Sequence, residues 1–192
     1  YLISDGLVKF VIFNGLHSAF IRNSLTKEQY RFFFSQYYFY SKSFTRILST
    51  MMVKCDDDNL RRQLIDNLWE EAGESDASQS HPMLFRRFLS RAMDVESTLS
   101  LEKKDYTDVF TDEYIALCMN STPLECAAIL AFATEGMVPR LYSIFKMGMM
   151  KIGINEDDLE FFTVHIGCDD GHAEVLEDIV AYYSGQDGWE EA

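Results

Sequence analysis

Apolar side chains recur at helical spacing along most of this 192-residue chain, and this periodicity limits its fold more than any other feature. Leu60, Leu64 and Leu68 show the pattern, each four residues after the last. Only three prolines are present to interrupt such stretches, and no segment shows the alternation that is typical of a strand. The sequence therefore predicts an all-α domain, in which short connections favour antiparallel helices packed in a bundle.

Local signals mark where the helices begin. Thr26 with Gln29 three residues later forms a capping-box pattern, and Pro123 suits an early helical position. The aspartates at 56–58 favour a helix N-terminus. We predict seven helices in a single domain covering residues 1–192, at about 5–22, 26–53, 59–72, 81–93, 108–119, 123–150 and 159–183.

Composition excludes several classes of function. The formal net charge of −14 argues against a nucleic-acid partner, and the longest apolar run, residues 126–133, is too short to span a membrane. No secretory signal peptide is visible. The four cysteines show no CxxC spacing, which argues against a zinc or disulfide framework. Free thiols suit a reducing compartment, so we expect a cytoplasmic protein.

The stretch "FFTVHIGCDDGH", residues 161–172, places residues typical of metal ligands on a face that should be apolar. In a helix, His165, Asp169 and His172 lie at i, i+4 and i+7, on one side. Leu176 continues the same face and is expected in the core. These three polar side chains are therefore predicted to point inward.

Two glutamates repeat this anomaly on other helices. Glu71 continues the apolar stripe of its helix, whereas Glu70 falls on the polar side. Glu135 continues the inward stripe that contains Leu124 and Ala131. Burying an unpartnered, charged carboxylate costs on the order of several kcal/mol of desolvation free energy, unless its pKa rises until the group is neutral. Such residues therefore need a partner inside the protein.

A single inward Glu or His is ordinarily a hydrogen-bonded core residue, but the joint pattern favours metal ions. Two divalent cations would balance the inward carboxylates, and mixed carboxylate and imidazole ligands suit iron or manganese. Facing helices of a bundle are where such sites form. His81, directly before Pro82, could complete the set if its loop returns it toward Glu71. The alternative for His81 is a solvent-facing position at the start of a helix.

Three segments carry a resemblance to a known family: "NLWEEAGESDASQSHPMLFRRFL", "ATEGMVPRLY" and "FFTVHIGCDDGHA". They resemble the haem-oxygenase-like non-haem diiron oxidases and oxygenases. The resemblance covers nearly the whole chain and implies a haem-oxygenase-like seven-helix bundle. It also implies a metal site with six ligands, which are Glu71, His81, Glu135, His165, Asp169 and His172.

The resemblance further implies an enzyme that uses two iron ions, or manganese, with O2 as cosubstrate. The expected substrate is a small amino-acid-derived or fatty-acid-like molecule, and N-oxygenation, C–C cleavage and desaturation all stay open. It implies no catalytic residue beyond the metal ligands; an external reductant and a homodimer are compatible with it. The aromatic residues of 32–40 are expected to line part of an apolar pocket, with Arg46 and Arg140 as candidates for holding a substrate carboxylate.

Some residues depart from the family, and different functions compete. Glu74 lies in a longer loop than in a chlamydial member and could compete as a ligand, and His17 stands near where that member has a tyrosine. His17 could also act as the proximal ligand of a haem oxygenase. A metal-independent enzyme of the same fold, either TenA-like with a cysteine nucleophile or quinone-synthesis-like, is a further possibility. A non-enzymatic helical interaction module is the last competing function.

Overall fold

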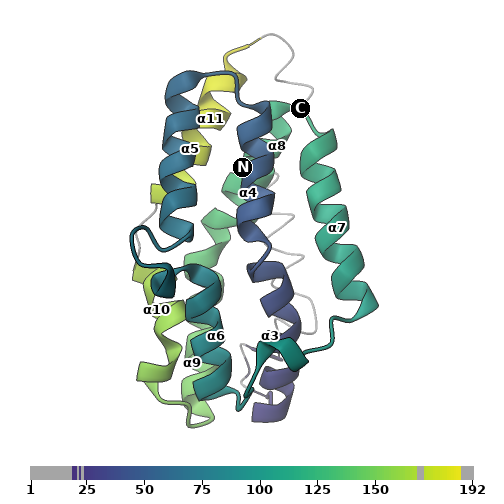
Figure 1. The fold of residues 1–192 in the computed structure, drawn as a ribbon, viewed down its shortest axis with the longest axis vertical. Coiled ribbons are helices and arrows are strands. Elements are labelled where there is room, and N and C mark those ends of the chain that lie inside the picture. Colours follow the sequence, from purple (N-terminus) through teal and green to yellow (C-terminus); the bar gives the residue numbers. More distant parts are fainter. Residues whose placement is uncertain (1–18, 21, 23, 168–170, 187–192) are drawn as a thin grey trace.

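The computed structural model describes residues 19, 20, 22, 24–167 and 171–186, and within them the regular structure is helical throughout (Figure 1). This confirms the all-α prediction. The α-helices are α3 (Lys27–Ser41), α4 (Phe44–Lys54), α5 (Asp58–Glu71), α6 (His81–Ala92), α7 (Asp105–Asn120), α8 (Pro123–Ala133), α9 (Val138–Lys151), α10 (Glu160–Gly167) and α11 (Gly171–Ser184). Short 3₁₀ helices connect some of them, among them η1 (Ala77–Gln79), η3 (Glu135–Met137) and η4 (Glu156–Leu159).

The helices form two tiers along the long axis of the molecule. Figure 1 shows α4, α5, α7, α8 and α11 in the upper part and α3, α6, α9 and α10 in the lower part. Each tier has its own core. The lower core is aromatic and contains Phe34, Phe85 and Phe162, whereas the upper core is mostly aliphatic, around Ile47 and Leu130. The helix ends between the tiers therefore meet at mid-height.

Two of the predicted helices are divided at this level, which corrects the sequence-based boundaries. The segment predicted as 26–53 breaks at residues 42–43 between α3 and α4. The segment predicted as 123–150 breaks at Thr134, which has φ −123° and ψ −86°. The segment predicted as 159–183 contains α10 and α11, and residues 168–170 between them lie outside the described residues.

The predicted capping signals are confirmed. Thr26 and Thr122 each accept a hydrogen bond from the backbone three residues later and complete capping boxes with Gln29 and Glu125. The predicted helix at 5–22 lies almost entirely outside the described residues, apart from positions such as Phe20, which packs against Tyr30.

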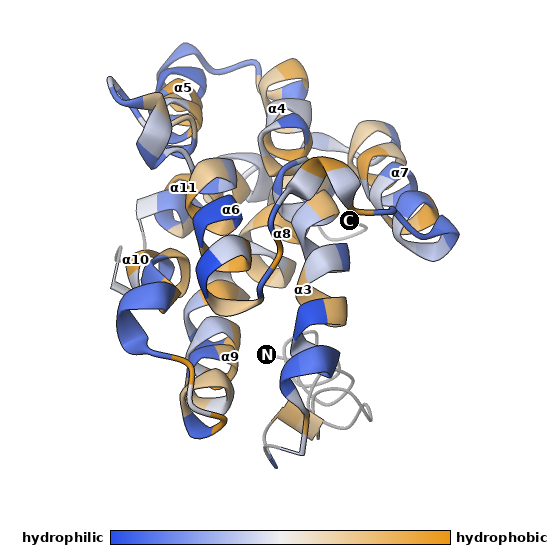
Figure 2. Ribbon diagram, turned by 60° about the horizontal axis from the view of Figure 1, so that its bottom comes forward, coloured by the Kyte–Doolittle hydropathy of each residue, from blue (hydrophilic) through white to orange (hydrophobic). Residues whose placement is uncertain are grey.

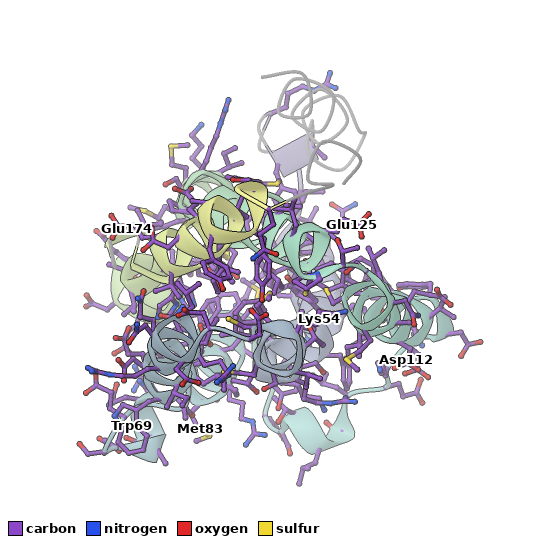
Figure 3. The ribbon with its side chains drawn as sticks, turned by 90° about the horizontal axis from the view of Figure 1, so that it is seen from above. Lys54, Trp69, Met83, Asp112, Glu125 and Glu174 are labelled. Atoms are coloured by element: carbon purple, nitrogen blue, oxygen red, sulfur yellow. The ribbon has the colours of Figure 1, made fainter. Side chains whose placement is uncertain are left out.

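The helix α8 lies between its neighbours and is coloured mostly apolar in Figure 2. Its residues Cys126, Ala127, Leu130 and Ala131 are fully buried. Viewed from above, Lys54 lies among the upper helices, whereas Trp69 and Glu174 lie at the periphery (Figure 3). In the described part of the chain, no helix combines the length and apolar character that crossing a bilayer requires.

Candidate metal centre

Five of the six predicted ligands lie at the junction of the two tiers, each at or near a helix end. Glu71 is the last residue of α5, His81 is the first of α6, and Glu135 opens η3. His165 lies near the end of α10 and His172 near the start of α11. The sixth predicted ligand, Asp169, lies outside the described residues.

The loop after α5 returns the chain so that His81 meets Glu71. Gly73 has φ +87°, and a Cβ added there would lie 2.4 Å from the backbone nitrogen of Ser80, so the tight turn requires glycine. Pro82 then occupies an early position of α6. As a result His81 Nδ1 lies 2.7 Å from Glu71 Oε2. This confirms that His81 turns back toward Glu71 and does not face solvent.

Glu135 reaches the site because α8 ends at Ala133, two residues before it. The Tyr114 hydroxyl forms a hydrogen bond with Thr134 Oγ1, and that oxygen lies 3.2 Å from the carbonyl oxygen of Ile129, to which it donates. A Cβ at position 136 would lie 2.7 Å from the carbonyl oxygen of Ala131, so Gly136 permits the close turn. Glu135 is thus placed by a helix break and not, as predicted, by an unbroken helical stripe.

The imidazoles surround the carboxylate of Glu71, whose side chain is only 4% exposed. His81 approaches Oε2, and His165 Nε2 lies 3.0 Å from His81 Nδ1. On the other side, His172 Nδ1 lies 3.5 Å from Glu71 Oε1. The two oxygens of Glu71 therefore face two separate groups of imidazole nitrogen atoms.

One subset has the spacing of ligands around a single cation. One carboxylate oxygen each of Glu71 and Glu135 and one nitrogen of His172 all lie within 4.8 Å of one another. Oxygen and imidazole donors in this combination fit iron or manganese. The donor set therefore fits the metal that the sequence implied, whereas the role of each residue as a ligand stays a prediction.

The pKa values show how much charge is concentrated here. Burial raises the pKa of Glu71, but hydrogen bonds from His172 and His81 outweigh it and lower that pKa to about 2. Burial and the nearby charge of Glu71 raise the pKa of Glu135 to about 7. Glu71 is thus ionised at neutral pH, while Glu135 is close to half protonated.

The pKa values of His165 and His172 shift in opposite directions. Burial and the charge of His81 lower the pKa of His165 to about 4. Burial also disfavours charge on His172, but its hydrogen bond to Glu71 and the charges of Glu71 and Glu135 raise its pKa to about 9. At neutral pH His165 is therefore neutral, whereas His172 carries the proton that balances the carboxylates.

A small cavity of about 30 Å³ opens onto these groups. Beside Glu71, His81, Glu135 and His165, its walls are Tyr37, Tyr40, Ser41, Phe44, Thr134, Val138, Tyr142 and Phe161. The hydroxyl oxygens of Tyr37 and Tyr142 lie 2.9 Å apart, and burial raises the pKa of Tyr37 to about 12. The phenol hydroxyls therefore stay protonated. Because one of them donates to the other, one O–H of the pair is left to donate to a bound molecule.

Several sequence-based expectations about this pocket are corrected. Of the aromatic segment, Tyr37 and Tyr40 line the pocket, but Phe34 and Tyr38 are buried in the core and Phe32 is 56% exposed. Arg46 and Arg140 are exposed and lie outside the lining of the pocket.

Some further candidate residues do not join the site or lie beyond what the structure describes. Glu74 is exposed in its loop and absent from the pocket lining. Cys118 and Cys126 are fully buried and do not reach the pocket either, which disfavours them as nucleophiles. His17 and Cys168 lie outside the described residues.

Two functional candidates escaped the sequence reasoning. Thr134 and Tyr142 lie on either side of Glu135 in the "ATEGMVPRLY" segment and line the pocket. Gly136 and Pro139, which follow the break at Thr134, were the available signal.

Comparison with known proteins agrees with this geometry. The profile of a family described as iron-containing redox enzymes matches residues 31–191. That range covers all six predicted ligands and most of the chain. The chain belongs to this family.

Relatives of this chain are named as synthases. It is 27% identical to a 4-chloro-allylglycine synthase of Streptantibioticus cattleyicolor over 169 residues, 88% of this chain and 64% of that protein. It is 26% identical to a 4-aminobenzoate synthase of Chlamydia trachomatis over 155 residues, 79% of this chain and 65% of that protein. The corresponding protein of Chlamydia pneumoniae is 29% identical over 81% of this chain and 70% of its own length. The chain thus spans just under two thirds of the length of the first two relatives.

The stability of the metal-free protein and the stabilisation that metal confers on it are expected to change with pH in opposite directions. The pKa of His172 rises from 6.5 to about 9 on folding, so its stabilising effect is complete below pH 6.5 and is lost as pH rises through 9. The pKa of Glu135 rises from 4.5 to about 7 on folding, so its titration adds to this loss of stability up to about pH 7. The lowered pKa of His165 makes the folded protein more stable as pH rises, but this effect is confined to the lower range between about pH 4 and 6.5.

The metal-free protein should therefore lose on the order of 2 kcal/mol of stability between pH 6.5 and 8.5. Metal binding must displace the same protons, so the stabilisation that Zn²⁺ or anaerobic Fe²⁺ confers should grow with pH. Thermal melting at several pH values, with and without metal, measures both trends. Parallel pH curves for the two forms would contradict the assignment.

Proposed function

We propose that this chain is a single non-haem diiron domain that activates O2 to oxidise a small organic substrate. The observation that carries the proposal is the carboxylate of Glu71, whose two oxygens face His81 and His172 on opposite sides. A carboxylate in this position can bridge two cations. The family, which consists of iron-containing redox enzymes, supports iron as the metal.

In this proposal six residues hold the iron ions: Glu71, His81, Glu135, His165, Asp169 and His172. Iron bound there would supply one-electron chemistry toward O2, and an external reductant would return it to the reduced state. Burial raises the pKa of Glu135 to about 7 in the metal-free site. Loading the site therefore requires that Glu135 and His172 give up their protons.

The pocket positions the substrate beside these ligands. Its apolar walls, including Phe44, Val138 and Phe161, can pack against a small aliphatic or aromatic body. The hydroxyls of Tyr37 and Tyr142 share one hydrogen bond, so the pair has one O–H left to donate to an acceptor oxygen on that molecule. The relatives' names, a chloro-allylglycine synthase and aminobenzoate synthases, support an amino-acid-derived substrate. A cytoplasmic location and a homodimer belong to the same proposal.

Metal loading of the purified chain tests this function. Anaerobic loading with Fe²⁺ followed by elemental analysis should give about two iron ions per chain, as the six-ligand set requires. The loaded protein should then consume O2 in the presence of a reductant, and the metal-free protein should not. A chain that retains no iron, or that consumes O2 equally without it, would refute the proposal and favour a metal-independent enzyme or an interaction module.

A further inference from the structure

One polar face of α5 contacts His172 at three points. Glu71 approaches Nδ1 of its ring, while Glu70 Oε2 lies 2.9 Å from Nε2. Asn67, which is buried, lies with its side-chain nitrogen 3.4 Å from the carbonyl oxygen of His172 and donates to it. Asn67, Glu70 and Glu71 are spaced i, i+3 and i+4, so they share one side of the helix.

These contacts divide the two nitrogen atoms of the His172 ring between different tasks. Nε2 forms a hydrogen bond with the carboxylate of Glu70, whose side chain is 53% exposed. Nδ1 is left facing Glu71 and the acidic cluster. An imidazole whose outer N–H donates to a carboxylate has its other nitrogen free as a metal ligand and its ring orientation restrained.

We propose that Glu70 is a positioning residue that, together with Asn67, orients His172 so that Nδ1 faces the metal. This inference rests on the proposed diiron function. It changes the interpretation of Glu70, which the helical pattern placed on the solvent side. Glu70 keeps its solvent exposure, but its carboxylate contacts α11 through His172.

A comparable restraint holds His165 through the backbone. Its Nδ1 lies 2.6 Å from the carbonyl oxygen of Phe161, one helical turn earlier, which leaves Nε2 facing His81. His165 therefore needs no side-chain partner for its orientation. Among the described residues, His172 is contacted from α5, through Glu70, Glu71 and Asn67.

Metal binding to Glu70 variants tests the inference. Glu70→Ala should weaken the binding of one of the two metal ions by about 10- to 100-fold, as loss of such an outer partner does. Glu70→Gln keeps an acceptor oxygen and should restore much of the affinity. Asp66→Ala is the matched control, because it removes an equal charge from an exposed position one turn earlier on α5. Titration with Fe²⁺ under anaerobic conditions, followed by elemental analysis, gives the affinity and the stoichiometry.

A second readout reports on the ring itself. In the Zn²⁺-loaded wild type, long-range ¹H–¹⁵N correlation spectra should show His172 protonated at Nε2 and metal-bound at Nδ1. Glu70→Ala should disturb this signature while leaving that of His165 unchanged. Circular dichroism of each metal-free variant checks that the fold is kept.

The outcomes separate the inference from the proposed function. If the wild type binds no metal, the proposed function fails and the inference with it. If the wild type binds metal and Glu70→Ala binds it equally well, the inference alone is wrong. Equal weakening by Asp66→Ala would show an effect of surface charge, and equal weakening by Glu70→Gln would show that the hydrogen bond is not the cause; either result overturns the inference.

Discussion

Replacing Glu71 by Gln is expected to reduce iron affinity by at least about 100-fold and to abolish iron-dependent O2 consumption. Glu71 is the only described carboxylate that lies within hydrogen-bonding reach of His81 and also faces His172. It is ionised at neutral pH, because the imidazoles around it lower its pKa to about 2. A neutral amide removes that charge and the oxygen that both sides of the site share, so both metal positions should weaken together.

Glu74→Gln is the matched control for this substitution. Glu74 lies three residues later in an exposed loop with φ +53° and takes no part in the pocket. Its replacement should leave two iron ions bound and O2 consumption unchanged. Elemental analysis after anaerobic loading and an oxygen electrode measure both variants. Full iron content in Glu71→Gln, or an equal loss in Glu74→Gln, would show that the wrong carboxylate was assigned to the site.

Iron binding is expected to slow amide exchange by about 100-fold in α10 and in the first turns of α11. His165 and His172 lie in this stretch, together with Gly167 and Gly171. Each glycine in a helix costs about 1 kcal/mol relative to alanine, so helical structure in this stretch is intrinsically weak. A metal at 100 times its dissociation constant stabilises the bound form by about 2.7 kcal/mol, which corresponds to the expected factor.

Hydrogen exchange followed by mass spectrometry, on peptides from α10 and the first turns of α11, measures this effect. Under conditions where local opening dominates, peptides from α7 should exchange equally with and without iron, because α7 carries none of the proposed ligands. Gly171→Ala adds a methyl group that meets nothing within 4 Å. This variant should slow exchange in the metal-free protein and have little effect in the loaded one. Equally strong protection in wild-type protein without iron would contradict the coupling of local folding to metal binding.

Helix phase alone identified much of the candidate site. The leucine stripe of α5 was enough to turn Glu71 inward and Glu70 outward, and the structure buries Glu71 to 3% exposure. The spacing of His165 and His172 likewise predicted that both would lie near the core. These inferences succeed because side-chain direction in a helix depends only on the helix period.

Glu135 shows how far such reasoning extends. The sequence predicted it as the next member of an apolar stripe on an unbroken helix, but the chain breaks at Thr134 and Glu135 opens a 3₁₀ turn. The residue still reaches the pocket, for a different reason. At this break Thr134 forms a hydrogen bond with Tyr114, which lies on another helix. The helix propensity and periodicity of residues 133–138 carry no information about that contact.

The sequence by itself determined the helical class, the capped start at Thr26, and the inward direction of Glu71. Only the tertiary structure decided which ends meet, and thus that Glu70 contacts His172 and that Tyr142 lines the pocket. Periodicity and capping are properties of a single segment, whose energies depend on neighbours within a few residues. Contacts between segments depend on where helices break and on how two cores pack, and these follow from burial summed over the whole chain.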